Sequence, residues 1–115
     1  MLNLYPTDTD LETALLATRV VHTDTTVVVV LEGELDLASA PRLERELLAL
    51  FARPVHIVTL DLAALTFMDS SGLNVLNRVR VTADDHGIKL TLRNVREQVQ
   101  RVLEVTNMVE LFTIE

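Results

Sequence analysis

The order of apolar segments along the chain constrains its fold more than any other feature. Three runs rich in Val, Ile and Leu, at residues 26–33, 55–62 and 88–92, are typical of β-strands. They alternate with segments whose apolar residues recur at helical spacing. Strands separated by helices of this length pair in parallel through right-handed crossovers. The order therefore predicts one α/β domain with a mixed, mostly parallel β-sheet and helices in the β-α-β crossovers.

Further segments complete the predicted sheet. Residues 14–22 indicate an antiparallel N-terminal edge strand, joined to residues 26–33 by the polar turn at 23–25. The continuous Val-rich run at 26–33 predicts a strand buried on both faces. Residues 63–68 are expected to form a loop, and residues 111–114 a short closing strand. The polar, acidic residues 1–13 are expected to form a loose N-terminal arm, which leaves residues 14–115 as the domain.

Capping signals predict where three helices begin and end. Ser39 is a candidate cap for the first helix, Pro41 is tolerated in its first turn, and it ends before Pro54. The second helix is expected over residues 70–85, with Gly87 after it. The third is expected to begin with a capping box formed by Asn94 and Glu97 and to stop at Asn107, which can adopt a left-handed conformation. The predicted inward-facing residues are Leu43, Leu47, Leu50, Phe51, Leu73, Leu76, Val79, Ala83, Val95, Val99, Val102 and Leu103.

Composition excludes several classes of function. A hydrophobic fraction of 49% excludes a disordered chain, whereas an aromatic fraction of 3% argues against a base-stacking nucleic-acid binder. A net charge of −7 makes nucleic acid and anionic membranes poor partners. The longest strictly apolar run, residues 27–31, is far too short to span a membrane, and no basic region typical of a signal peptide opens the chain. We therefore expect a soluble cytoplasmic protein.

The chain also lacks the usual signatures of an enzyme or a metal site. It contains no cysteine, and His22, His56 and His86 have no spacing typical of a metal site or a catalytic triad. Three glycines are too few for the common phosphate-binding loops. The sequence therefore disfavours an enzyme and predicts no cofactor and no metal.

The most informative segment is Phe-Met-Asp-Ser-Ser-Gly-Leu at residues 67–73. It predicts a strand-to-helix turn at the carboxyl end of the sheet, where parallel α/β folds place functional loops. Asp69 is a natural N-cap that can accept from the amide of Ser71 or Gly72. Ser70 then takes the first helical position with its hydroxyl outward, and Gly72 allows another surface to approach the backbone. Taken alone, the segment is a well-capped helix start.

In combination with two other segments, this one resembles the bacterial anti-sigma factor antagonist family, whose fold is the STAS domain. The family's Asp-Ser-(Ser or Thr)-Gly-Leu motif matches residues 69–73, within a similar stretch at 60–76. Its Gly-Glu-(Leu or Ile)-Asp strand end and following helix are similar to residues 31–36 and 40–43. Its last helix and tail are similar to residues 99–107 and 111–112. The resemblance covers residues 14–115, in the expected order.

This resemblance implies a phosphorylation-controlled binding protein. Ser70 matches the serine that is phosphorylated by a partner that is both an anti-sigma factor and a serine protein kinase. The unphosphorylated form would bind that partner and release a sigma factor, phosphorylation would switch binding off, and a Ser/Thr phosphatase would reverse it. Asn74 and Asn107 stand where many members have Gly. The residues implied in partner binding are Glu34, Asp36, Asp69, Ser70, Ser71, Gly72 and Asn74.

Two other functions remain open at this stage. One is a STAS scaffold or transport-accessory module that binds a protein without a phosphoswitch. The other is a small α/β enzyme or nucleotide-binding domain that uses Asp61, Asp69 and Ser70 as ligand groups. The second alternative predicts a pocket at the carboxyl end of the sheet.

Overall fold

A five-stranded mixed sheet forms the centre of the computed structural model, which describes residues 15–115. The strands lie side by side in the order in which they occur in the sequence. The first two are antiparallel and all the others pair in parallel, which confirms the predicted α/β fold. The strands are β1 (Leu16–Thr23), β2 (Thr26–Leu35), β3 (Ile57–Met68), β4 (Lys89–Arg93) and β5 (Thr113–Ile114).

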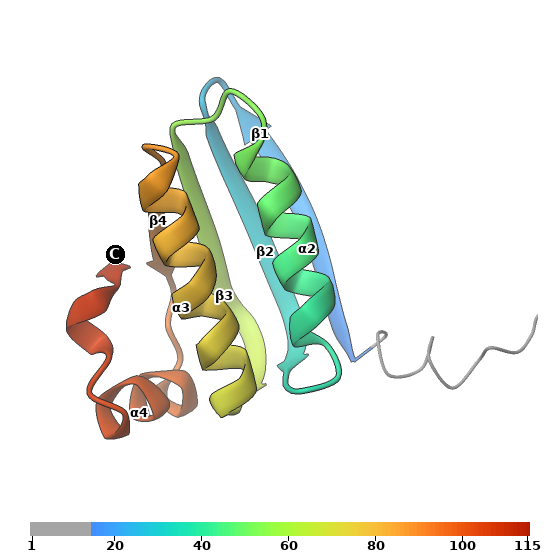
Figure 1. The fold of residues 1–115 in the computed structure, drawn as a ribbon. Coiled ribbons are helices and arrows are strands. Elements are labelled where there is room, and N and C mark those ends of the chain that lie inside the picture. Colours follow the sequence, from blue (N-terminus) through green and yellow to red (C-terminus); the bar gives the residue numbers. More distant parts are fainter. Residues whose placement is uncertain (1–14) are drawn as a thin grey trace, which may run out of the picture.

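Three α-helices connect the parallel strands in this part of the chain. Helix α2 (Ala40–Phe51) and helix α3 (Ser70–Asp85) lie side by side across one face of the sheet (Figure 1). Helix α4 (Glu97–Val105) lies near the carboxyl end of β3, and a 3-10 helix, η1 (Val109–Leu111), leads into β5 (Figure 1). None of the described helices is long and apolar enough to cross a membrane. Residues 1–13, the predicted arm, and Ala14 lie outside the described residues.

The prediction that the Val-rich second strand is buried on both faces is wrong. In β2, Val27, Val29 and Leu31 are buried, whereas Val28 and Val30 are only half-buried. Successive side chains of a strand point to opposite faces, and α2 and α3 cover the same face (Figure 1). The hydrophobic core therefore lies between these helices and one face of the sheet.

Both central strands run further than the sequence indicates. Residues 63–68, expected to form a loop, are the second half of the 12-residue strand β3, and β2 continues to Leu35. The pairing of β2 with β3 shifts register between Val30 and Glu32 and again between Gly33 and Glu34. Such irregularities interrupt the alternation by which a strand is recognised in a sequence.

The start of α4 also differs from its prediction. Asn94 is not a helix cap: its backbone is left-handed (φ 58°), and its side-chain amide donates to Asp61. The helix begins at Glu97 with Arg96 in the N-cap position and no side-chain cap. The predicted capping box is therefore wrong, because Asn94 belongs to the turn that follows β4.

Other predicted boundaries agree with the structure or shift by a few residues. Helix α3 spans the predicted residues 70–85, and Asn107 (φ 63°) is left-handed as expected. Ser39 occupies the N-cap position of α2, but its hydroxyl makes no capping hydrogen bond to that helix. The expected closing strand at 111–114 is shortened to Thr113–Ile114, because η1 takes the residues before it.

Candidate functional site

Two turns lie next to each other at the carboxyl ends of β2 and β3. Glu34 pairs with Phe67 and Leu35 with Met68 in the parallel ladder. Beyond the last pair, the amide of Asp69 donates to the carbonyl of Leu35 at 3.3 Å. The structure thus brings together the two acidic segments, 34–36 and 69–72, that the sequence singles out.

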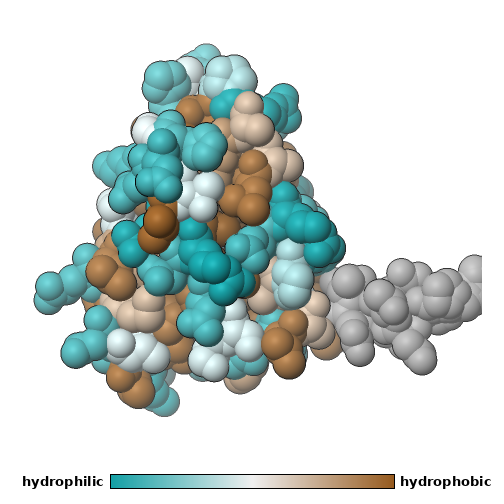
Figure 2. Space-filling view, in the orientation of Figure 1, coloured by the Kyte–Doolittle hydropathy of each residue, from teal (hydrophilic) through white to brown (hydrophobic). Residues whose placement is uncertain are grey.

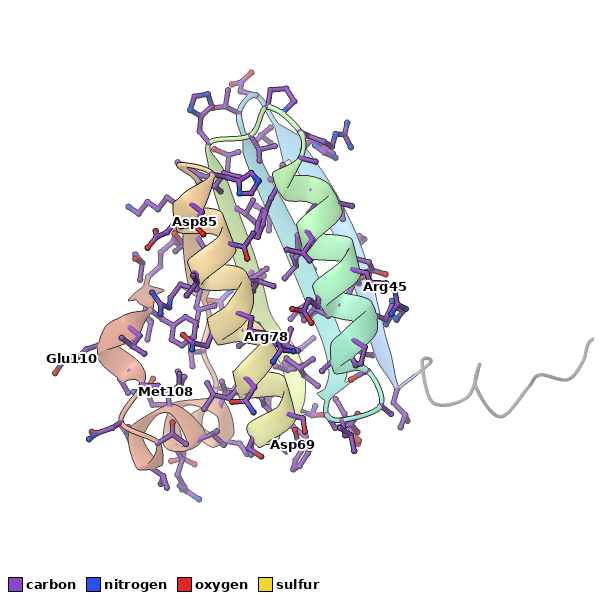
Figure 3. All side chains as sticks on the ribbon, in the orientation of Figure 1. Arg45, Asp69, Arg78, Asp85, Met108 and Glu110 are labelled. Atoms are coloured by element: carbon purple, nitrogen blue, oxygen red, sulfur yellow. The ribbon has the colours of Figure 1, made fainter. Side chains whose placement is uncertain are left out.

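The Asp69 turn presents a serine at the surface. Asp69 has extended backbone angles, and its Oδ1 accepts a hydrogen bond of 3.0 Å from the amide of Gly72. Ser70 is the first residue of α3 and is exposed at the end of the helix where Figure 3 labels Asp69. The predicted cap and the predicted outward position of Ser70 are both confirmed.

Gly72 is buried under the neighbouring strand. A Cβ atom at this position would lie 2.7 Å from both Cγ and the carbonyl oxygen of Leu35. It would also lie 2.9 Å from Cγ of Met68. The surface that approaches Gly72 is therefore the protein's own β2, and the glycine allows α3 to begin directly against that strand.

The Asp36 turn is an internally bonded loop before α2. Oδ1 of Asp36 accepts from the amides of Ala38 at 3.0 Å and Ser39 at 3.1 Å. The hydroxyl of Ser39 donates to the carbonyl of Glu34 at 2.9 Å and accepts from the amide of Asp36 at 3.0 Å. Ser39 is completely buried within this loop, whereas Leu37, at the tip of the loop, is 75% exposed.

A shallow groove separates the first turns of α2 and α3. Its volume is about 210 Å³, and it contains two of the predicted binding residues, Ser71 and Asn74. Arg78 at its far end forms a two-pronged ion pair with Glu44 of α2, with distances of 3.0 and 3.1 Å. The hydrogen bond from Arg78 holds the pKa of Glu44 below its ordinary value. The lining residues are Leu37, Ala40, Pro41, Ser71, Asn74, Val75 and Arg78.

Exposed apolar side chains accompany the polar ones at this site. Figure 2 shows apolar and polar side chains interspersed over the face formed by α2 and α3. Leu37, on the Asp36 turn, is exposed, and Phe67, the last residue but one of β3, is 40% exposed. Sequence reasoning did not select Leu37 as a site residue, although an apolar residue between the turn-forming Asp36 and Ser39 is a usable signal.

Gln98 of α4 is a second residue that sequence reasoning missed. Its Oε1 accepts from the amide of Met68 at 3.1 Å, and its Nε2 donates to the carbonyl of Met68 at 3.2 Å. The carboxamide thus pairs with the last residue of β3 as a neighbouring strand would. It holds the main chain immediately before Asp69, and only the tertiary structure brings α4 to this place.

Asp61 lies apart from the serine turn. Its carboxylate accepts from Arg93 at 3.0 Å, from Asn94 at 3.1 Å and from the amide of Ala63 at 3.1 Å. Burial acts to raise the pKa of Asp61, but these hydrogen bonds outweigh it and lower the pKa. Asp61, within β3, therefore binds the end of β4 and the turn that follows it, and it does not join Asp69 and Ser70 in one ligand site.

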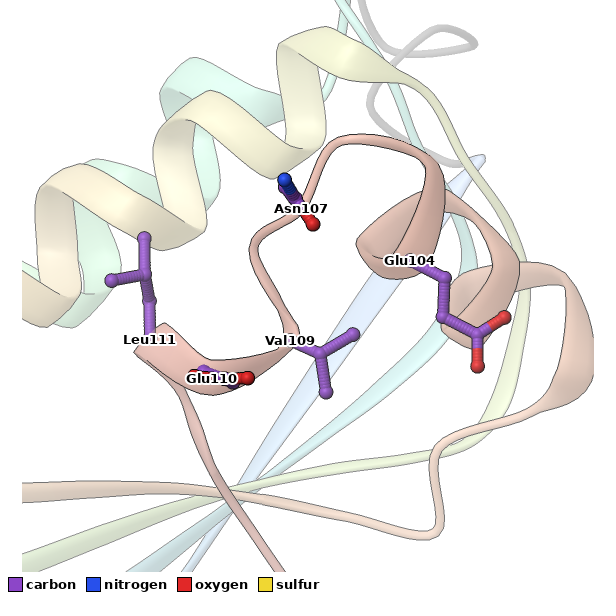
Figure 4. A pocket seen from close by; sticks show the side chains of 5 residues that line it. All are labelled: Glu104, Asn107, Val109, Glu110 and Leu111. Carbon is purple, nitrogen blue, oxygen red and sulfur yellow. The ribbon is translucent and has the colours of Figure 1, made fainter.

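A more voluminous hollow, of about 480 Å³, lies elsewhere (Figure 4). It lies between the end of α4 and η1, and it is not at the Ser70 turn. Within residues 15–115, no group of three or more His, Cys, Asp or Glu side chains could hold a metal ion. The residues that line the hollow are Glu104, Asn107, Val109, Glu110 and Leu111.

The fold and the serine turn define a class of small α/β domains with a mixed sheet and an exposed serine directly after the N-cap of a helix. Residues 17–115 match the STAS domain family. The chain therefore belongs to the STAS domain family.

Relatives with described roles include an anti-sigma-B factor antagonist from Staphylococcus epidermidis. It is 28% identical over 82 residues, which are 71% of this chain and 76% of the relative. The crystal structure of an anti-sigma factor antagonist from Mycobacterium paratuberculosis has a TM-score of 0.73 at 27% identity, over 86% of this chain and 84% of that one. The phosphorylated form of the Bacillus cell fate determinant SpoIIAA shares the fold, with a TM-score of 0.68 at 21% identity, over 86% and 91% of the two chains.

Proposed function

We propose that this protein is an anti-sigma factor antagonist whose binding to its partner is switched off by phosphorylation of Ser70. The observation that carries the proposal is the exposed position of Ser70 at the start of α3, directly after the capping residue Asp69. The similarity to two anti-sigma factor antagonists supports the choice of partner. The partner would be an anti-sigma factor that is also a serine protein kinase.

In the unphosphorylated state, the two turns form the binding surface. Asp36 and Asp69 supply carboxylates at its two sides, and Ser71 and Asn74 supply polar groups in the groove between α2 and α3. Leu37 supplies an apolar contact, because its side chain projects from the loop with little of it covered. Occupation of the anti-sigma factor by this surface would release the sigma factor.

Phosphorylation would change the charge of this surface with little change in the fold. A phosphoserine carries about 1.5 to 2 negative charges, and the free amides of a helix N-terminus accommodate an anion. The cap between Asp69 and Gly72 does not involve the hydroxyl of Ser70, so it persists. At an interface, however, the phosphate must lose its hydration beside the Asp69 carboxylate. A penalty of about 1.4 kcal/mol would already weaken binding about tenfold.

The protein supplies the phosphoacceptor and the binding surface, and no chemistry of its own. The kinase would transfer the γ-phosphate of ATP to the Ser70 hydroxyl. ADP is the leaving group of this step, and the kinase takes up the hydroxyl proton. A Ser/Thr phosphatase would return the antagonist to its binding form. The separation of Asp61 from Ser70 argues against the alternative of a ligand site built from these residues.

Incubation with ATP and the cognate kinase, followed by mass spectrometry, tests the proposal. We expect one phosphate on Ser70 and none on the Ser70→Ala variant. The Ser71→Ala variant should still carry its phosphate on Ser70, which would show that the neighbouring serine is not the acceptor. In binding assays, Ser70→Asp should weaken the complex at least about tenfold.

Phosphate at another residue would contradict the switch. Unchanged affinity of Ser70→Asp would point instead to a STAS scaffold that binds a protein without a phosphoswitch.

A further inference from the structure

The two edges of the sheet differ in how far they are open to another strand. The edge formed by β5 is only two residues long. The opposite edge, β1, has eight residues and pairs with β2 in unbroken register from Leu16↔Gly33 to Thr23↔Thr26. Strand edges are commonly protected by shortness, proline or a bulge, and β1 has none of these. Within residues 15–115, no strand pairs with its outer side.

The hydrogen-bond pattern identifies which groups of β1 point outward. The carbonyl of Leu15 accepts from the amide of Glu34 at 2.8 Å, so these residues form a hydrogen-bonded pair. In an antiparallel ladder such pairs alternate with non-bonded ones. The even-numbered residues of β1 therefore direct their amides and carbonyls away from β2. At one end the carbonyl of Leu16 already accepts from the guanidinium of Arg42. The backbone amides and carbonyls that remain open on this edge are those of Thr18, Val20 and His22.

The side chains of this free stretch are apolar at its centre. Val20 is 41% exposed and Val21 is 39% exposed, and they lie on opposite faces of the strand. The strand carries no acidic residue, and its ionisable residues are Arg19 and His22. A neighbouring strand would therefore cover a valine on each face of the sheet. The carboxylate bonded to this stretch is that of Glu46 on α2, which accepts from the hydroxyl of Thr18 at 2.7 Å.

We propose that a second copy of this chain pairs with β1, antiparallel, with the two-fold axis at Val20. In this register Val20 lies opposite the second copy's Val20, and Thr18 lies opposite the second copy's His22. The outward amides and carbonyls of Thr18, Val20 and His22 then all pair with those of the second copy. The edge is thus complementary to itself.

The neighbouring registers are less favourable for stated reasons. A shift by two in one direction places Arg19 opposite the second copy's Arg19, and like charges directly opposite destabilise a sheet. It also needs the carbonyl of Leu16, which Arg42 occupies. A shift by two in the other direction pairs Thr18 with the second copy's Asp24, which lies in the left-handed hairpin turn (φ 49°) and is not extended.

The proposed dimer joins two sheets into one continuous sheet and leaves the Ser70 surfaces uncovered. Because the two β1 strands run in opposite directions, the two Ser70 turns lie at opposite ends of the dimer. Interfaces below about 1,200 Å² are typical of weak complexes, and pairing through one short strand belongs to this class. We therefore expect dimerisation to depend on protein concentration.

A disulfide test exploits the absence of cysteine from the sequence. In a hydrogen-bonded antiparallel pair the two Cα atoms are about 5.5 Å apart, which a disulfide can span. Under mild oxidation, Val20→Cys should form a covalent dimer at least about ten times faster than Val81→Cys, a collision control on α3 with similar exposure (45%). Arg19→Cys should behave like the control, because the two copies of this residue are diagonal neighbours. Equal rates for all three variants would overturn the proposal.

Analytical ultracentrifugation of the unmodified chain provides the second test. The average mass should rise with concentration toward that of a dimer, and Val20→Pro should remain monomeric. Proline removes only an outward amide at an edge strand, so the far-ultraviolet spectrum and melting temperature should be retained. A chain that is monomeric up to millimolar concentration would overturn the proposal. Dimerisation of folded Val20→Pro would equally overturn it.

Discussion

The turns that follow β2 and β3 contain the same type of hydrogen bond but place their serines differently. In each, the carboxylate of an aspartate accepts from the amide three residues further on, which belongs to Ser39 in one turn and to Gly72 in the other. The first turn folds its serine inward, where Ser39 is completely buried. The second needs a glycine at the equivalent place and leaves Ser70 outside. A serine near a capping aspartate is therefore structural or accessible according to its position in the turn.

Among the variants that test this comparison, Gly72→Ala is expected to lose the most unfolding free energy. The added Cβ would lie 2.7 Å from the carbonyl oxygen of Leu35, a backbone atom that cannot move aside without disturbing the end of β2. Overpacking of this kind costs about 3 kcal/mol of unfolding free energy. Asn74→Ala, two residues along the same helix and exposed, is the control and should change stability by less than about 0.5 kcal/mol. Urea denaturation of both variants measures the difference. Equal stabilities would mean that the close contact between α3 and β2 is not maintained in solution.

A smaller effect distinguishes the two serines. Ser39→Ala leaves the carbonyl of Glu34 and the amide of Asp36 without the hydroxyl that they share, at a cost of about 2 kcal/mol. Ser70→Ala should leave the unfolding free energy within about 0.5 kcal/mol of that of the parent, because the exposed hydroxyl makes no hydrogen bond to residues 15–115. Thermal unfolding of the two variants tests this directly. A marked loss of stability in Ser70→Ala would contradict the division into a structural and an accessible serine.

The smallest difference in stability is expected between substitutions of the two aspartates. Asp36→Ala removes an acceptor for two backbone amides, and we expect a loss of about 1.5 kcal/mol. Asp69→Ala removes an acceptor for one amide, and the expected loss is about 1 kcal/mol. Asn substitutions at the two positions keep an acceptor oxygen and serve as matched controls, with smaller losses at both. A larger loss at Asp69 than at Asp36 would reverse the view that the Asp36 turn is the more firmly bonded.

Short-range patterns predicted a large part of the fold and of the site. The order of strands and helices, the bounds of α3, the Asp69 cap and the outward position of Ser70 follow from propensity, periodicity and capping, which act over a few residues. The errors arose where a distant part of the chain decides the local structure. The spacing of Asn94 and Glu97 predicts a helix cap, but the side-chain amide of Asn94 instead donates to Asp61 on another strand.

Local patterns in the sequence therefore specify an α/β chain with a serine directly after the N-cap of its second crossover helix. Three features lie beyond such patterns: β3 continues to Met68, one face of β2 stays partly open, and the Asp36 and Asp69 turns meet. These features depend on pairing between strands, on the side of the sheet that the helices take and on the packing of Leu35 against Gly72. All of these are contacts between residues far apart in the chain, and no local pattern of amino acids encodes them alone.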